Sequence, residues 1–103
     1  MSRAILFPAI ISLIVLYSLP GAAAGEEWEK LTARSFELYE AGRYDEAVRV
    51  SREALEAVRL AHGDGHPVTA KSMNNLGAML SKHGDENEAE RLLLDALDIL
   101  EKT

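Results

Sequence analysis

Beyond residue 27, apolar residues recur at the three- and four-residue spacing of amphipathic helices. The pattern predicts four helices: Trp28 to Ala41, about Tyr44 to Ala61, about Pro67 to Lys82, and Asp85 to about Lys102. No run of β-branched residues alternates with period two, so strands are not expected. The sequence therefore predicts an all-α fold.

The breaks between these segments carry residues that begin or end helices. Gly42 and Gly84 follow the first and third segments, and glycine tolerates the left-handed conformation common at helix ends. Pro67 suits the first turn of the third helix, where its missing N–H has no cost. Asp85 is a favoured N-cap residue, and Glu88 three residues later predicts a capping box.

The helical part repeats itself along the chain with a fixed period, which is the spacing from Leu38 to Leu80. Paired positions share the same residue type at Leu38/Leu80, Gly42/Gly84, Glu46-Ala47/Glu88-Ala89, Arg49/Arg91 and Ala54-Leu55/Ala96-Leu97. A fixed period of this size indicates a stacked-repeat protein. We therefore expect one domain, residues 25–103, built from two helix-turn-helix units at about 28–61 and 67–102. The small residues Ala47, Ala89 and Gly77 would let neighbouring helices approach closely.

These units resemble the tetratricopeptide repeat (TPR), and most closely the longer variant of that repeat found in kinesin light chain and many bacterial repeat proteins. The resemblance rests on the segments LYEAGRYDEA at 38–47, GDGHPVTA at 63–70 and SMNNLG at 72–77. The units depart from the pattern in two places. The second unit has Glu86 at the position of the aromatic Tyr44 in the first, and the first unit has Arg34-Ser35 where the second has Leu76-Gly77. The resemblance implies a short right-handed α-solenoid.

The resemblance also implies a role as a non-catalytic, cofactor-free scaffold that binds a peptide or partner helix in a concave groove. By similarity, the groove positions are Glu29, Thr32, Phe36, Tyr39 and Glu40, and then Lys71, Asn74, Ala78, Ser81 and Lys82. An amide such as Asn74 can donate to and accept from a peptide backbone, although the same side chain could simply be solvated. The positions that clamp a terminal carboxylate in some relatives lack cations here, so that ligand is not expected.

Other residues admit two interpretations each. His62, Asp64 and His66 have metal-ligand chemistry, which would permit a small zinc-dependent hydrolase. Alternatively, His62 ends a helix, where an imidazole favours the dipole, and His66 occupies the His-Pro position of the repeat. The aromatic residues Trp28 and Phe36, with Tyr39, either pack internally or contact a partner.

The segment Met1–Ala24 has the organisation of a secretory signal peptide. Arg3 precedes the uncharged stretch Ala4–Leu19, Pro20-Gly21 is expected to break any helix, and the small residues at positions 22–24 follow. Cleavage is expected between Ala24 and Gly25. The alternative is an uncleaved anchor holding an assembly factor in the membrane, although the stretch is shorter than the roughly 20 residues of a spanning helix.

Composition narrows the function further. The chain has 103 residues, no cysteine and a formal net charge of −6 from 11 basic and 17 acidic residues. A mildly acidic chain is a poor ligand for nucleic acid or anionic membranes. Without cysteine it has no disulfide, thiolate site or thiol nucleophile. We expect an exported protein of the bacterial periplasm or outside, membrane-associated only if the leader is retained.

Two repeats leave the last helix without a neighbour. Each repeat buries its apolar face against the next, and about three repeats are normally needed for stability. Leu93, Leu97 and Leu100 cannot all be covered by one preceding helix. Self-association, docking onto a partner, or further repeats encoded downstream would each cover them, and the isolated chain is expected to be oligomeric or partly folded.

Overall fold

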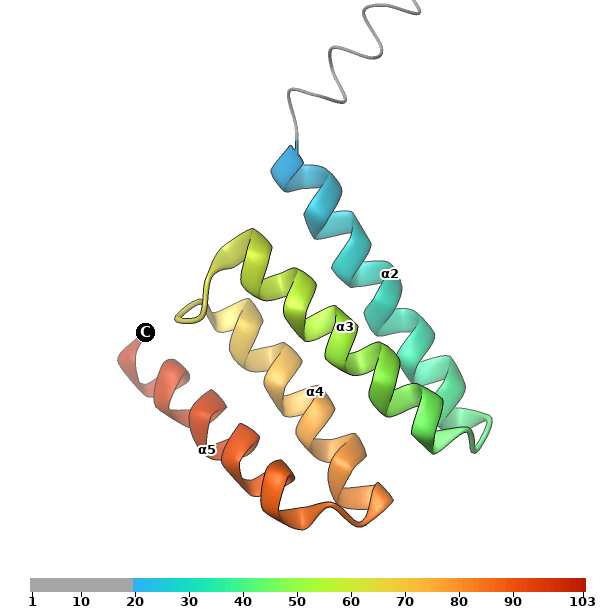
Figure 1. Cartoon of the computed structure of the whole chain (residues 1–103). Helices are drawn as coiled ribbons and strands as arrows, with labels where there is room; N and C mark the ends of the chain where they lie inside the picture. Colours follow the sequence, from blue (N-terminus) through green and yellow to red (C-terminus); the bar gives the residue numbers. More distant parts are fainter. Residues whose placement is uncertain (1–19) are drawn as a thin grey trace, which may run out of the picture.

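The computed structural model describes residues 20–103, and in that range the chain forms four helices and no strand. The helices are α2 (Pro20–Glu40), α3 (Tyr44–His62), α4 (Pro67–His83) and α5 (Glu86–Lys102), packed in chain order (Figure 1). The all-α prediction is confirmed, and the last three helices lie within about a residue of their predicted bounds. No helix in the described range is long and apolar enough to cross a bilayer.

The first helix differs from its prediction at its N-terminal end. Helix α2 begins at Pro20 and not at the predicted Trp28, whereas the expected break of a preceding helix at Pro20-Gly21 concerns a stretch outside the described residues. Proline is compatible with a first helical turn, and a single glycine costs a helix only about 1 kcal/mol. The predicted junction between Ala24 and Gly25 lies in α2, whereas Arg3 and the apolar stretch 4–19 lie outside the described residues.

The two turns inside the repeats have the same hydrogen bonds at equivalent positions. The N–H of Gly42 donates to Tyr39 and that of Arg43 to Leu38; the equivalent bonds run from Gly84 to Ser81 and from Asp85 to Leu80. This pair of bonds is the Schellman arrangement, which requires a left-handed residue at the helix end. Gly42 and Gly84 supply it, with φ of 80° and 99°.

The loop between the repeats is fixed by side chains of the next helix. The Thr69 hydroxyl donates to the Gly63 carbonyl at 2.6 Å, and Thr69 is fully buried. His66 caps α4, because its Nδ1 accepts the N–H of Val68 at 3.0 Å. Pro67 begins the helix, as predicted.

The predicted capping box at α5 is wrong. The Asp85 side chain makes no capping hydrogen bond. Glu88 instead bonds to Arg52 of α3, which satisfies its carboxylate away from the helix N-terminus. A charged partner gives the carboxylate a stronger hydrogen bond than a neutral backbone N–H does.

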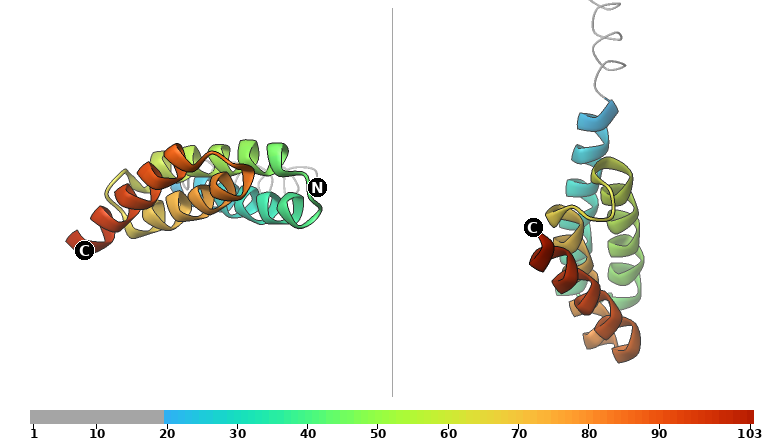
Figure 2. Two further views of the ribbon diagram at one scale, coloured as in Figure 1. Left: turned by 90° about the horizontal axis from the view of Figure 1, so that it is seen from below. Right: turned by 90° about the vertical axis from the view of Figure 1, so that its left-hand side faces the viewer.

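The core repeats with the same period as the sequence. Leu38 and Leu80 are both buried, as are the equivalent pairs Ala47/Ala89 and Ala54/Ala96. Helices α2 and α4 lie in one layer and α3 and α5 in the other, as the left view of Figure 2 shows. The helices thus form two stacked hairpins with one continuous core.

Close packing between α4 and α5 depends on Gly77. A Cβ added there would lie 3.1 Å from Cδ2 of Leu93 and 3.4 Å from the carbonyl oxygen of Ala89. The equivalent residue in the first repeat is Ser35, whose buried hydroxyl donates to the Thr32 carbonyl at 2.7 Å. The first repeat therefore tolerates a polar side chain by satisfying it within its own helix.

Candidate protein-binding groove

An apolar cavity of about 310 Å³ lies between the first helices of the two repeats. Each helix contributes three residues at i, i+3 and i+4, which share one helix face. The lining residues are Phe36, Tyr39 and Glu40 of α2, and Asn75, Ala78 and Met79 of α4. The cavity is therefore a product of repeat stacking and requires both units.

Two residues of different size, Phe36 and Ala78, face the cavity. They are separated by one full period of the repeat, so they occupy equivalent positions in the two units. The ring of Phe36 supplies apolar surface, and the short side chain of Ala78 leaves space beside it. Met79 closes the cavity from the core, because it is buried while Ala78 is exposed.

The tyrosine at the cavity wall is positioned by a second ring. Tyr39 packs edge-to-face against Tyr44 of α3, with ring centroids 5.2 Å apart and an interplanar angle of 68°. Such pairs contribute about 0.5–1.5 kcal/mol beyond the area that they bury. The equivalent residues in the second repeat are Ser81 and Glu86, so this support exists only on the α2 side.

Two polar side chains at the apolar cavity would orient a bound ligand. The amide of Asn75 is half-buried, and it can both donate and accept hydrogen bonds. Glu40 is exposed and places a carboxylate at the same cavity. An apolar group flanked by a hydrogen-bonding backbone and a cation would complement this arrangement.

Of the predicted groove positions, the structure brings together Phe36, Tyr39, Glu40 and Ala78. Thr32 does not line the cavity, because its hydroxyl donates to the Trp28 carbonyl of its own helix at 2.8 Å. The remaining predicted positions are exposed and do not line it: Glu29, Lys71, Asn74, Ser81 and Lys82.

Sequence reasoning missed Asn75 and Met79. Asn75 precedes Ala78 by three residues, so helical spacing alone would have placed it on the face of Ala78. Met79 was assigned no groove role, yet its buried side chain forms part of the cavity wall.

The histidines of the inter-repeat loop have structural contacts. The rings of His62 and His66 stack with centroids 4.7 Å apart, and Nδ1 of His66 is occupied by the Val68 N–H. Asp64 pairs with Nε of Arg59 at 3.1 Å. In the described residues, no group of three or more histidine or acidic side chains is arranged to hold a metal ion.

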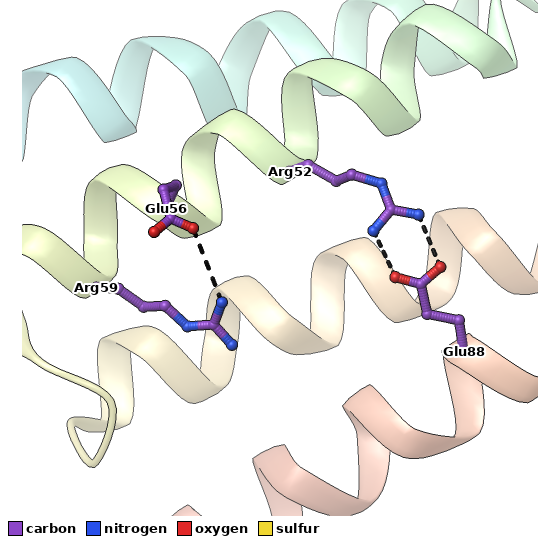
Figure 3. Close-up of polar contacts among 4 residues, drawn as sticks. All are labelled: Arg52, Glu56, Arg59 and Glu88. Carbon is purple, nitrogen blue, oxygen red and sulfur yellow. Dashed lines mark hydrogen bonds and ion pairs between the residues drawn. The ribbon is translucent and has the colours of Figure 1, made fainter.

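A second depression, of about 250 Å³, lies between α3, α4 and α5 and is lined by paired charges. Arg52 donates two hydrogen bonds to Glu88, and Arg59 lies 3.9 Å from Glu56 (Figure 3). The hydrogen bond from Arg52 lowers the pKa of Glu88, and the same hydrogen bond raises the pKa of Arg52. Because opposite charges already neutralise one another here, the depression offers an ionic ligand little net attraction.

A family model described as Tetratricopeptide repeat matches residues 36–102, from the cavity face of α2 to the end of α5. No curated protein matches the chain. The matched residues include every side chain that lines the apolar cavity.

Proposed function

Because this chain belongs to the tetratricopeptide repeat family, whose repeats mediate protein–protein interactions, we propose that it is an exported scaffold for a peptide or partner helix. The length of the sequence period, from Gly42 to Gly84, supports the longer, kinesin-light-chain-like variant of the repeat. The proposed binding surface is the cavity between α2 and α4 with its exposed surroundings.

The apolar cavity carries this proposal. Its volume of about 310 Å³ lies at the lower end of the range for ligand pockets, about 300–1,000 Å³. It therefore suits one bulky apolar side chain of a partner segment. Phe36 and Met79 would contact that side chain, and burying it removes apolar area from water at about 25 cal/mol per Å².

The polar groups around the cavity favour a particular partner sequence. The Asn75 amide suits a hydrogen bond with the partner's backbone. Glu40 favours a lysine or arginine next to the apolar anchor in the partner. We therefore expect a segment in which a large apolar residue stands beside a basic one.

Selection from a displayed peptide library against the full chain tests this function. Selected peptides should share an apolar anchor with a neighbouring basic residue, and Ala78→Phe should reduce their binding by about tenfold or more by filling the cavity. Leu60→Phe, at an 82 % exposed position on α3, is the control and should leave binding unchanged. If the selected peptides bound the Ala78→Phe variant and the natural chain with equal affinity, this cavity would be excluded as their binding site.

We also propose that residues 1–24 are a cleaved signal peptide, so that the mature chain starts at Gly25 in the periplasm or outside the cell. The uncharged stretch 4–19 and the small residues before Gly25 support this. Intact-mass measurement of the protein from its natural source should give a chain beginning at Gly25. A mass that includes Met1–Ala24 would instead support the membrane-anchored assembly factor.

A further inference from the structure

Helix α5 forms one edge of the stack (Figure 1), and several of its leucines are exposed. The surface here called the leucine face consists of Leu93, Leu97 and Leu100, which are all exposed. Exposure of these leucines confirms the sequence-based expectation that a single preceding helix would not cover them.

The first repeat shows what this face is shaped to hold. The equivalent residues in α3 are Ser51, Leu55 and Val58, and all three are buried. Leu55 is 4 % exposed and lines the same depression as Leu76 of α4, whereas its counterpart Leu97 is 53 % exposed. In the first repeat, therefore, these positions of the second helix are covered by the helix that follows.

The opposite edge of the stack is unlike the leucine face. Helix α2 forms that edge, and its exposed charged residues include Glu27, Lys30, Arg34 and Glu37. Their equivalents in α4 are all buried: Thr69, Ser72, Leu76 and Met79. Burying unpaired charges against leucines would be costly, so α2 of a second copy is a poor occupant for the leucine face.

Two acidic residues lie along one side of the leucine face. Glu90 lies seven residues before Leu97 and Glu101 lies four after it, so both are on the same side of the helix. Glu90 is equivalent to Val48, which is buried. Both glutamates are exposed, and neither belongs to an ion pair among the side chains of residues 27–103.

Helix α4 covers the equivalent face of α3, where the residues equivalent to Glu90 and Glu101 are Val48 and Arg59. Helix α4 contains no acidic residue and carries Lys71 and Lys82. An α5–α5 pair between two copies would behave differently. It would set Glu90 against Glu101 if the helices were antiparallel, or against a second Glu90 if they were parallel, and like charges across an interface are unfavourable.

We propose that the leucine face of α5 is a second docking surface, which binds an amphipathic helix of a partner protein. The occupant has an apolar stripe flanked by lysine or arginine. Its stripe covers Leu93, Leu97 and Leu100, and its basic residues pair with Glu90 and Glu101. This surface is separate from the cavity between α2 and α4, and its occupation does not depend on the peptide bound there.

Two synthetic helical peptides test the proposal on the full chain. Both carry the same leucine stripe, and the residues that flank the stripe are lysine in one and glutamate in the other. Measured by fluorescence anisotropy, the lysine peptide should bind about tenfold or more tightly than the glutamate peptide. Leu97→Ser should weaken binding of the lysine peptide by about tenfold. Circular dichroism should show unchanged helix content, because Leu97 is half-exposed.

Charge-reversal and groove variants separate this surface from the rest. The double variant Glu90→Lys with Glu101→Lys should reverse the preference between the two peptides. Leu60→Ser should leave binding of the lysine peptide unchanged, whereas a loss of binding in Ala78→Phe would place the peptide in the cavity between α2 and α4 and overturn the proposal. Equal binding of both peptides, or no effect of Leu97→Ser, would overturn the proposal. A dimer that Leu97→Ser converts to monomer in sedimentation would also overturn it, by assigning the leucine face to a second copy.

Discussion

Arg52 in α3 and Glu88 in α5 form an ion pair with two hydrogen bonds, one of them 2.7 Å from Nη2 to Oε1, although 36 residues separate them. The pair joins the second helices of the two repeats, which are not neighbours in the chain (Figure 3). Its geometry is that of a bidentate arginine–carboxylate contact, which is stronger than a single hydrogen bond. It therefore helps to fix the angle at which one repeat stacks on the next.

Glu88→Gln should destabilise the chain at neutral pH and have no effect in acid. Arg52 lowers the pKa of Glu88 in the native state, so the pair stabilises the native state fully above the ordinary glutamate pKa of about 4.3. This contribution is lost as the pH falls through the lowered native pKa. Because both side chains are partly exposed, we expect a loss of at most about 1 kcal/mol at pH 7 in urea denaturation.

Glu53→Gln is the matched control for that measurement. Glu53 pairs with Arg49 at 2.8 Å within α3, so its loss removes an ion pair without uncoupling the repeats. It should cost only a few tenths of a kcal/mol. A loss in Glu88→Gln that is the same at pH 3 and pH 7 would show that packing, not charge, is responsible.

Apart from the start of α2, the sequence predicted the helix ends well because they are set by local chemistry. Gly42 and Gly84 adopt the left-handed conformation that ends α2 and α4, and Pro67 begins α4. These effects depend only on neighbouring residues, so spacing alone reveals them. The fixed period of the sequence then predicted which residues become equivalent in the core.

What the sequence did not predict depends on contacts between distant residues. Glu88 three residues after Asp85 has the spacing of a capping box, but Arg52 lies close enough to compete for its carboxylate. The cavity is a similar case. The resemblance placed Phe36 and Ala78 in a groove, whereas the contribution of Met79 appears only once α2 and α4 are set beside each other.

Gly84→Ala should destabilise the chain by about 1–2 kcal/mol, because Gly84 has a φ of 99° and a Cβ is disfavoured in the left-handed region. An added Cβ would meet nothing within 4 Å, so the loss measures backbone strain alone. Gly65→Ala is the control, because Gly65 is outside that region and also has open space around it. It should be neutral or slightly stabilising; equal losses at both sites would contradict the explanation.

Ala89→Leu should cost about 1–3 kcal/mol by overpacking the contact between α4 and α5. Ala89 is buried, and its carbonyl oxygen lies close to Gly77, so the added atoms cannot be accommodated without separating the helices. Ala47→Leu should have a similar effect in the first repeat, because the equivalent alanine is also buried. Asn87→Leu adds apolar atoms at an exposed site on α5 and should change the urea midpoint little. A tolerated Ala89→Leu would mean that the helices pack less closely than described.

Tyr44→Ala should weaken peptide binding in the groove although Tyr44 does not line the cavity. Its ring holds Tyr39 at the cavity wall through the edge-to-face contact at 5.2 Å. Removing it should cost about 0.5–1.5 kcal/mol of stability and leave Tyr39 free to adopt other rotamers. The resulting loss of preorganisation should lower, by several-fold, the affinity for a peptide selected against the natural chain. Tyr44→Phe keeps the ring and should restore both properties, because the contact is between rings and does not require the hydroxyl. If Tyr44→Ala lowered stability but left peptide affinity unchanged, Tyr39 would not be a binding residue, and the groove would consist of Phe36 and the α4 side chains alone.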